Sequence, residues 1–283
     1  MKRLILATLL GALFLAATPL LAQDTKRAIT KIAGDLYRFQ NKFHYSVFLV
    51  TPDGIIATDP INPDAAKWLK DELKSRFGVP VKYLVYSHDH RDHSAGGEVF
   101  KPEATVIAHE NARAAIVGEQ RPTAVPDVTF SDRMTVTLGG KSVELIYLGR
   151  SHSDNMIVMH FPAERALFTV DFVSVNRLPY MGLSDAYFPD WIDAVEKVEA
   201  MDFDILVPGH GPLGTKADAT AHREYLQALY DAVLDGARKG QSLDDMKKSI
   251  TLDGFNAMGM YGKWRELNIE GMYRQVTLHR RGN

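Results

Sequence analysis

The sequence predicts an α/β fold, and three observations support this prediction. Short apolar runs rich in β-branched and aromatic residues recur between residues 36 and 207, which is typical of strands. An amphipathic helical pattern separates two of these runs, at residues 54–59 and 81–86, so that strand, helix and strand follow one another. No internal repeat, low-complexity segment or linker rich in Gly, Ser or Pro divides the chain. We therefore expect one large α/β domain.

The first half is predicted to begin with a meander. Strand-like runs occupy residues 36–39, 45–51 and 54–59, with a Pro-Asp-Gly turn before the third. Residues 64–77 have the amphipathic helical pattern, Gly78-Val79-Pro80 ends it, and residues 81–86 form the next strand. A short helix should follow Gly96-Gly97, then a strand at 105–109 and a helix at 110–117. Prolines interrupt the pattern from 119 to 132, which predicts a surface loop.

The second half is predicted to contain a second set of strands. Residues 134–138 and 143–148 flank Gly139-Gly140, a hairpin signal, and residues 156–161 and 166–170 form another antiparallel pair. A helix should run from Trp191 to about Met201 with Asp190 as its N-cap, before a short strand at 205–207. Patterns at 217–240, 243–250 and, more weakly, 261–280 predict helices packed on the same domain, which could also shape a substrate pocket or a dimer face.

The most informative stretch is residues 88–93, His-Asp-His-Arg-Asp-His. It follows a predicted strand and gathers three imidazoles and two carboxylates, whose desolvation must be compensated. A divalent cation compensates well, because neutral imidazole and carboxylate are ligands that zinc accepts. His88 and His90 are two residues apart and point the same way in an extended segment. Asp92 and His93 follow the turn and suit a second ion; a histidine-rich surface turn is the alternative.

The pattern His88-x-His90-x-Asp92-His93 resembles the signature of the metallo-β-lactamase superfamily of hydrolases. The resemblance implies four further landmarks: a later histidine, an acid after a strand, a histidine in a glycine turn, and an aspartate after an early strand. In this sequence they are His152, Asp171, His210 and Asp59. The resemblance covers roughly residues 30 to 215. It implies a four-layer αβ/βα sandwich, here with extra C-terminal helices.

The same resemblance implies a site for two Zn²⁺ ions, although ligation by N and O alone also allows iron or manganese. The implied ligands of the first ion are His88, His90 and His152; those of the second are Asp92, His93 and His210; Asp171 bridges the two. Two ions roughly 3.5–4 Å apart would share a hydroxide, because they lower the pKa of bound water towards about 7. This hydroxide would attack the carbonyl of the substrate. Asp92 and Asp59 are the predicted catalytic residues, with Asp59 fixing the tautomer of a ligand histidine.

The implied substrate is a small carbonyl compound, a cyclic amide or ester such as a β-lactam or a lactone. Ser174 stands where related β-lactamases carry a lysine and lactonases a tyrosine, so neither specificity transfers intact, although Arg177 or Tyr180 could substitute. Residues 178–188 look like an apolar pocket wall. A thioesterase of the glyoxalase II type, a phosphodiesterase, and a non-catalytic metal-binding protein are the alternatives. We interpret the other histidines considered, His44, His109, His222 and His279, as structural, with a position facing the site as the alternative for His44.

The N-terminus predicts export. Lys2 and Arg3 precede a largely apolar run from Leu4 to Leu21 and a cut after Ala22, so residues 1–22 form the expected signal peptide, with an uncleaved anchor as the alternative. Residues 23–215 would form the catalytic domain and 216–283 its helical extension. We expect a periplasmic or secreted bacterial protein.

Composition limits the partners and the ligand chemistry. Cleavage of the signal lowers the formal net charge from −2 to −4, and basic runs are missing, so neither nucleic acid nor stable membrane association is expected. The chain has no cysteine, which excludes disulfides and thiolate ligands. The expected partner is a small-molecule substrate, and a homodimer is left open.

Overall fold

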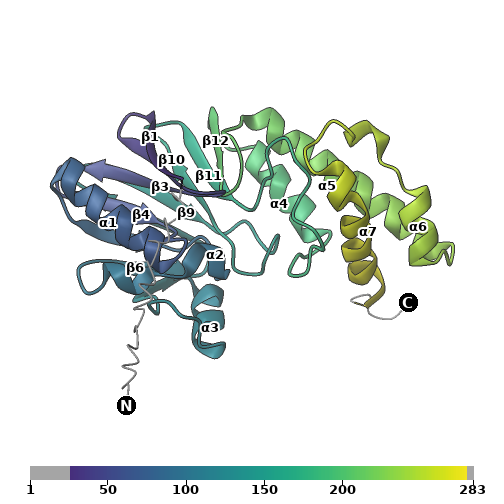
Figure 1. Cartoon of the computed structure of the whole chain (residues 1–283), viewed down its shortest axis with the longest axis horizontal. Coiled ribbons are helices and arrows are strands. Elements are labelled where there is room, and N and C mark those ends of the chain that lie inside the picture. Colours follow the sequence, from purple (N-terminus) through teal and green to yellow (C-terminus); the bar gives the residue numbers. More distant parts are fainter. Residues whose placement is uncertain (1–25, 279–283) are drawn as a thin grey trace, which may run out of the picture.

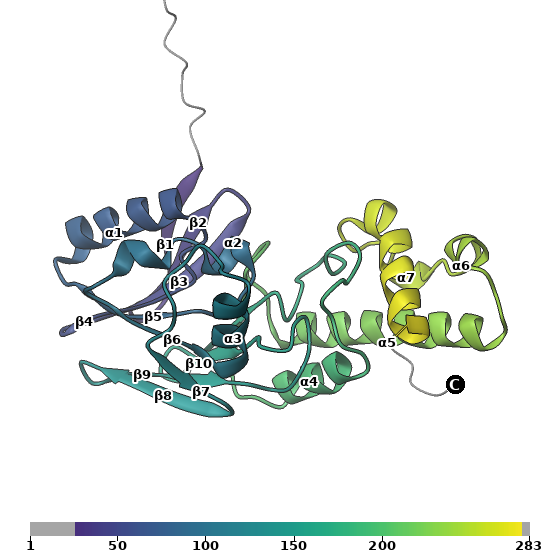
Figure 2. The ribbon, with the colours of Figure 1, turned by 90° about the horizontal axis from the view of Figure 1, so that it is seen from below.

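The computed structural model describes residues 26–278. Two β-sheets pack face to face and helices cover their outer faces (Figures 1 and 2). The predicted signal peptide and His279 lie outside the described residues. Within residues 26–278, the helices are too short or too polar to cross a bilayer.

The first sheet carries the beginning of the chain to one edge of the site. Its strands, in spatial order, are β1 (Arg27–Ala33), β2 (Leu36–Asn41), β3 (His44–Thr51), β4 (Gly54–Thr58), β5 (Val81–Val85), β6 (Thr105–His109) and β7 (Val128–Phe130). The first four strands pair antiparallel, and β4 to β7 pair parallel. Since β4 and β5 are parallel neighbours, the residues that follow them leave the sheet at the same edge.

The second sheet delivers the later half of the site. Its order is β12 (Ile205–Pro208), β11 (Ala166–Val170), β10 (Val158–Phe161), β9 (Lys141–Ile146) and β8 (Arg133–Leu138). All pairs are antiparallel except β11 with β12, which is parallel. The residues after β11 and β12 therefore also leave at one edge.

Helices complete the four layers. On the outer face of the first sheet lie α1 (Pro63–Phe77) and α3 (Glu110–Gly118), whose buried side chains join those of β3 and β4 in one hydrophobic cluster. Asn62 caps α1 by accepting a hydrogen bond from Ala65 N, and Gly78 ends the helix in the left-handed conformation. Leu69 is 1% exposed, and burial of such a side chain stabilises the fold by about 1.5–3 kcal/mol.

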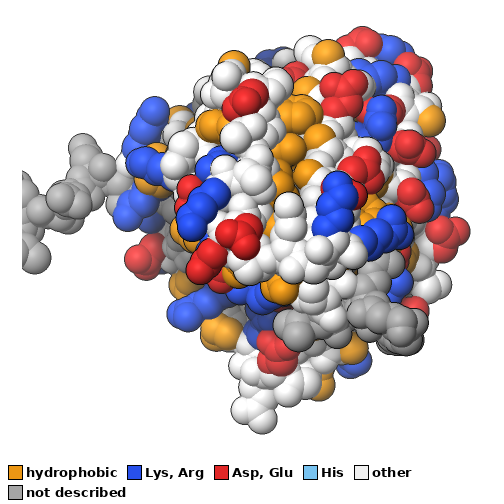
Figure 3. Space-filling model, turned by 90° about the vertical axis from the view of Figure 1, so that its right-hand side faces the viewer, with side chains coloured by type: hydrophobic (Ala, Val, Ile, Leu, Met, Phe, Trp, Pro, Cys, Tyr) orange, Lys and Arg blue, Asp and Glu red, His pale blue; other side chains and the backbone are white. Residues whose placement is uncertain are grey.

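A larger cluster lies between the sheets and continues beneath the C-terminal helices. It joins β8–β12 with α4 (Asp190–Glu199), α5 (Lys216–Arg238) and buried residues of α7 (Tyr261–Leu278). The shorter elements are α2 (Arg91–Ser94), η1 (Gly97–Phe100), α6 (Leu243–Ser249) and η2 (Asp253–Phe255). The face at the C-terminal helices shows a band of hydrophobic side chains between charged ones (Figure 3).

The structure corrects three sequence expectations. Strand β1 was not expected, because it lies at a sheet edge and shows no buried face that would produce alternation. Strand β7 falls within the predicted loop 119–132 and has only three residues, too few for a periodic signal. Asp190 is the first residue of α4 rather than its N-cap. Pro189 holds the cap position, and the Asp190 carboxylate instead accepts a hydrogen bond from Arg150 Nε at 2.7 Å.

Candidate metal centre

All seven predicted metal ligands lie at one edge of the two sheets. They follow β5, β11 and β12 or, for His152, precede β10. They form two groups, and within each group the ligand atoms lie within 4.8 Å of one another. The first group is His88, His90 and His152; the second is Asp92, His93, Asp171 and His210. The structure thus brings together every residue that the sequence pattern singled out, while their role as ligands stays a prediction.

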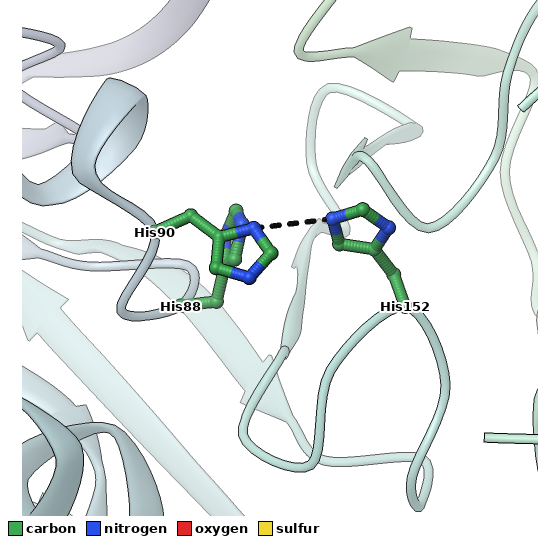
Figure 4. A group of neighbouring side chains, drawn as sticks. All are labelled: His88, His90 and His152. Atoms are coloured by element: carbon green, nitrogen blue, oxygen red, sulfur yellow. Dashed lines mark hydrogen bonds between the residues drawn. The ribbon is translucent and has the colours of Figure 1, made fainter. Parts of the chain in front are cut away.

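The first group is an all-imidazole cluster (Figure 4). His90 Nδ1 and His152 Nε2 lie 3.2 Å apart, and the His88 ring centroid lies 4.4 Å from that of His90. His88 Nε2 is buried and has no hydrogen-bond partner. An orphaned buried nitrogen is costly unless something binds it. Three converging imidazole nitrogens, one of them orphaned, fit a zinc ion.

Asp171 links the second group to the first. Its Oδ2 lies 3.3 Å from His93 Nε2 and 3.7 Å from His152 Nε2, while its Oδ1 lies 3.3 Å from His210 Nε2. Asp92 Oδ2 completes the second group at 3.5 Å from His210 Nε2. One carboxylate therefore reaches histidines of both groups.

Burial sets the protonation of two histidines of the first group. It lowers the pKa of His152 to about 4 and the pKa of His88 well below its ordinary value. Both imidazoles are therefore neutral near pH 7, the form that binds a metal. Burial also acts to lower the pKa of the third, His90, but its hydrogen bond to Asp185 and the nearby carboxylates outweigh burial and raise that pKa. At Asp171, burial raises the carboxyl pKa, but the charges of His93 and His210 outweigh it and hold the pKa well below its usual range. This acid is ionised, as a ligand must be.

Asp59 supports the site from behind. It is fully buried and accepts hydrogen bonds from Ser87 N at 2.8 Å and Ser87 Oγ at 2.7 Å. Its Oδ2 also lies 3.2 Å from His93 Nδ1, and Ser87 Oγ lies 2.9 Å from His88 Nδ1. The contact with His93 requires the proton on Nδ1 and leaves Nε2 free to face Asp171. The contact has the geometry expected of an orienting residue, while the catalytic role of Asp59 stays a prediction.

A second orienting acid, Asp185, was missed. Its Oδ2 lies 3.2 Å from His90 Nε2, so His90 presents Nδ1 to the first group. Asp185 sits on the long loop before α4, 14 positions after Asp171, and no spacing rule links it to a histidine. A carboxylate on the far nitrogen of a ligand histidine fixes the ring orientation and raises its basicity.

Another pair joins the two loops that carry the first group. Asp89 N donates to Asn155 Oδ1 at 3.0 Å, and Asn155 Nδ2 donates back to Asp89 Oδ1 at 2.9 Å. Arg121 pairs with the other oxygen of Asp89 at 2.7 Å. The side chain of Asp89 points away from the ligand groups and ties the loop of His90 to that of His152.

His44 differs from its sequence interpretation. The structure places it in the alternative position, facing the site: its Nε2 lies 3.4 Å from Asp92 Oδ2, and its ring packs edge-on against His210 at 4.7 Å. It lines an open cavity of about 440 Å³ together with Ile61, Pro63 and Asp92. By contrast, His109 stacks on Tyr147 at 4.1 Å, away from the site.

His222 is buried in α5 against Trp191, outside both ligand groups. The two residues that could substitute for the missing lysine or tyrosine, Arg177 and Tyr180, contact the C-terminal helices instead. The Arg177 guanidinium lies 4.7 Å from the Trp264 ring centre, and Tyr180 meets the same ring edge-on at 5.3 Å.

Comparisons with known proteins agree with this fold. The family model of the metallo-β-lactamase superfamily matches residues 43–210. The chain is 32% identical over 203 residues to the α subunit of a 2,4-dinitroanisole O-demethylase from Nocardioides, covering 69% of this chain and 62% of that subunit. It is 28% identical over 174 residues to a type 2 metallo-β-lactamase of Bacteroides fragilis, covering 60% of this chain and 66% of that enzyme.

A solved metallo-β-lactamase from Pontibacter korlensis shares the fold. Its TM-score is 0.66 at 23% identity, and the match covers 71% of this chain and 99% of that one. The family match spans more than half of the sequence and contains all seven predicted ligands. The chain belongs to the metallo-β-lactamase superfamily.

Proposed function

We propose that this protein is a metal-dependent hydrolase that opens a small cyclic amide or ester, a β-lactam or a lactone, at a site for two zinc ions. The observation that carries the proposal is the position of Asp171, within 3.3–3.7 Å of histidine nitrogens from both groups. A carboxylate in this position can give one oxygen to each of two adjacent metal ions and so bridge them. Two such ions, when bound, supply water with a pKa near 7 and Lewis acids for the carbonyl oxygen.

The chain's own residues hold and orient the reacting groups. His88, His90 and His152 would hold the first ion, and Asp92, His93 and His210 the second. Asp59 and Asp185 orient His93 and His90 through their far nitrogens. Rigid orientation of this kind lowers the cost of reaching the transition state, because the groups do not reorganise during the reaction.

Asp92 and His44 lie on the open side of the site. Their side chains are 49% and 30% exposed and face the cavity of about 440 Å³. We assign this pair the transfer of a proton from the attacking water to the ring nitrogen or oxygen whose bond to the carbonyl carbon breaks. The oxygen of that water remains on the carbonyl carbon. The cavity has both polar and apolar walls, which favours a small, partly hydrophobic substrate.

A second candidate is the cleavage of an activated aryl ether. The 32% identity to the demethylase subunit favours it, because this exceeds the 28% identity to the Bacteroides β-lactamase. In that reaction the oxygen of water would join the aromatic carbon, and methanol would leave with a proton. Thioester and phosphodiester hydrolysis on the same groups are further outcomes of the same test.

Parallel assays distinguish these activities. The zinc-loaded protein is offered a chromogenic cephalosporin, an acyl lactone, an acyl thioester, an aryl phosphodiester and 2,4-dinitroanisole, each with and without chelator. The proposal expects turnover of the cephalosporin or the lactone that chelator and Asp171→Ala both abolish. Turnover of the ether alone would favour the second candidate. A zinc-loaded protein that turns over none of the five would contradict an enzymatic role and favour a metal-binding protein.

We also propose that the enzyme works in the periplasm or outside the cell, on a small-molecule substrate and without nucleic acid or stable membrane association. The N-terminal signal pattern and the charge of −4 after its removal support this. Cell fractionation tests the location. Light scattering on the purified protein tests whether it forms a homodimer.

A further inference from the structure

The loop that carries Asp185 contains strained backbone. It leaves β11 and Asp171, runs through residues 178–186, and reaches α4. Within it, Met181 and Leu183 have φ values of +30° and +50°, in the left-handed region that disfavours side chains with a Cβ. Such strain persists only where surrounding structure imposes it. Something outside the loop must therefore hold it.

That structure is one face of α7. Asn268, Gly271, Arg274 and Gln275 follow one another at helical spacing, so they share a side of the helix. Arg274 Nη2 donates to Gly182 O at 3.0 Å and Gln275 Nε2 to Leu183 O at 3.4 Å. These two side chains bind backbone carbonyls of the loop, so the contact does not depend on the loop's own side chains.

Asn268 is the central contact. It is fully buried, and its Nδ2 donates to Pro179 O at 3.1 Å and also to Met181 O. Its Oδ1 accepts from Tyr225 OH of α5 at 2.8 Å. Both ends of the amide are thus hydrogen-bonded, the nitrogen to the loop and the oxygen to α5. A buried amide satisfied in this way specifies one arrangement, because any shift of the loop leaves polar groups unpaired.

Gly271 allows the close approach. A Cβ at this position would lie 2.1 Å from Gly182 O, well inside contact distance with backbone that cannot swing away. Helix and loop therefore meet backbone to backbone. The Arg177 guanidinium over Trp264, at 4.7 Å, adds a contact at the start of the loop.

We infer that α7 is a positioning element of the metal centre: Asn268, Gly271 and Arg274 hold loop 178–186 so that Asp185 orients His90. Helix α7 lies wholly beyond residues 43–210, the part that the family model covers. The C-terminal helices are then part of the site's machinery in this chain. The inference rests on the proposed function only in taking His90 as a metal ligand.

Hydrogen exchange on the metal-free protein tests the mechanical half. Arg274→Ala is the main variant, because the side chain is 45% exposed and its loss should leave the fold intact. Lys263→Ala, an exposed lysine on the same helix, is the matched control. Loop 178–186 should exchange about tenfold faster in Arg274→Ala, the effect of losing one charged hydrogen bond, and remain unchanged in Lys263→Ala. Asn268→Asp, which cannot donate to the carbonyls, should have a larger effect. Unchanged exchange of the loop in both Arg274→Ala and Asn268→Asp would overturn the inference.

A double-mutant cycle on zinc affinity tests the connection to His90. Asp185→Asn should weaken zinc binding about 10- to 100-fold, as loss of a histidine's orienting partner does. Arg274→Ala should weaken it also, but should add nothing in the Asp185→Asn background, since both act through one contact. Arg274→Lys should restore part of the affinity. Fully additive effects would refute the connection.

The two tests fail separately. A protein that binds zinc and shows the non-additive cycle, yet hydrolyses none of the five substrates, would contradict the proposed function and leave the role of α7 intact. A protein that binds no zinc would contradict both the proposed function and the role of α7 at a metal centre.

Discussion

Asp59→Asn should weaken zinc binding at the second ligand group without unfolding the protein. The substitution keeps the size of the side chain but replaces one acceptor oxygen with an N–H₂ group. Asp59 Oδ2 now serves Ser87 Oγ at 2.7 Å and His93 Nδ1 at 3.2 Å. The serine hydroxyl can rotate and accept from the new amide, whereas His93 Nδ1–H would face a donor.

The magnitude follows from that one lost contact. A hydrogen bond to a charged group contributes about 1.5–3 kcal/mol. If the loss is expressed in metal binding, zinc affinity falls by about 10- to 150-fold, at about 1.4 kcal/mol per tenfold. Because His93 is fully buried, water cannot replace the missing acceptor.

Competition with a chromophoric zinc chelator measures the affinity directly, and circular dichroism checks the fold. Asp64→Asn is the control, since Asp64 is an exposed acid in the first turn of α1 and lies outside the site. Wild-type affinity in a folded Asp59→Asn protein would refute the orienting role. Equal losses in Asp59→Asn and Asp64→Asn would show a general charge effect instead.

Three further predictions concern the surroundings of the site. Burial lowers the pKa of His222 to about 3, so the unfolded state takes up this proton at a higher pH than the folded state does. The free energy of unfolding of the metal-free protein should therefore fall as pH drops from about 6.5 towards 3. In His222→Leu, the free energy of unfolding measured with urea at each pH should depend less on pH. Arg38 Nη2 donates to Gly211 O at 2.5 Å, next to His210; Arg38→Met should therefore weaken zinc binding about tenfold or more in the competition assay, and unchanged affinity would contradict this. Zinc removal should lower the melting temperature measured by calorimetry, because a ligand bound only to the folded state stabilises it, and readdition should restore it.

The predicted ligand set came from the resemblance to the metallo-β-lactamase superfamily, whereas the convergence of several of its members could be expected because they follow strand ends. His88, Asp171 and His210 follow β5, β11 and β12 within three residues, and strand runs are recognisable from their apolar, β-branched composition. Parallel neighbouring strands then bring the residues that follow them to one edge of the sheet, independently of the loop conformations. The same reasoning placed Asp59 beside them.

The supporting contacts could not be predicted, because they depend on irregular backbone. Asp185 reaches His90 only through a loop in which Met181 and Leu183 adopt left-handed conformations. No residue pattern in the sequence predicts these two conformations. His44 lies at the end of a hairpin, where one residue decides which face it occupies. The contacts of α7 join segments almost 90 positions apart, and a helical pattern shows an apolar face without identifying its partner.

The central claim is that two metal ions share Asp171, and anomalous diffraction at the zinc absorption edge tests it most directly. Crystals of the zinc-loaded protein should show two peaks per chain, one among His88, His90 and His152 and one among Asp92, His93 and His210, with the Asp171 carboxylate between them. A single peak, or two peaks of which neither contacts Asp171, would contradict the account.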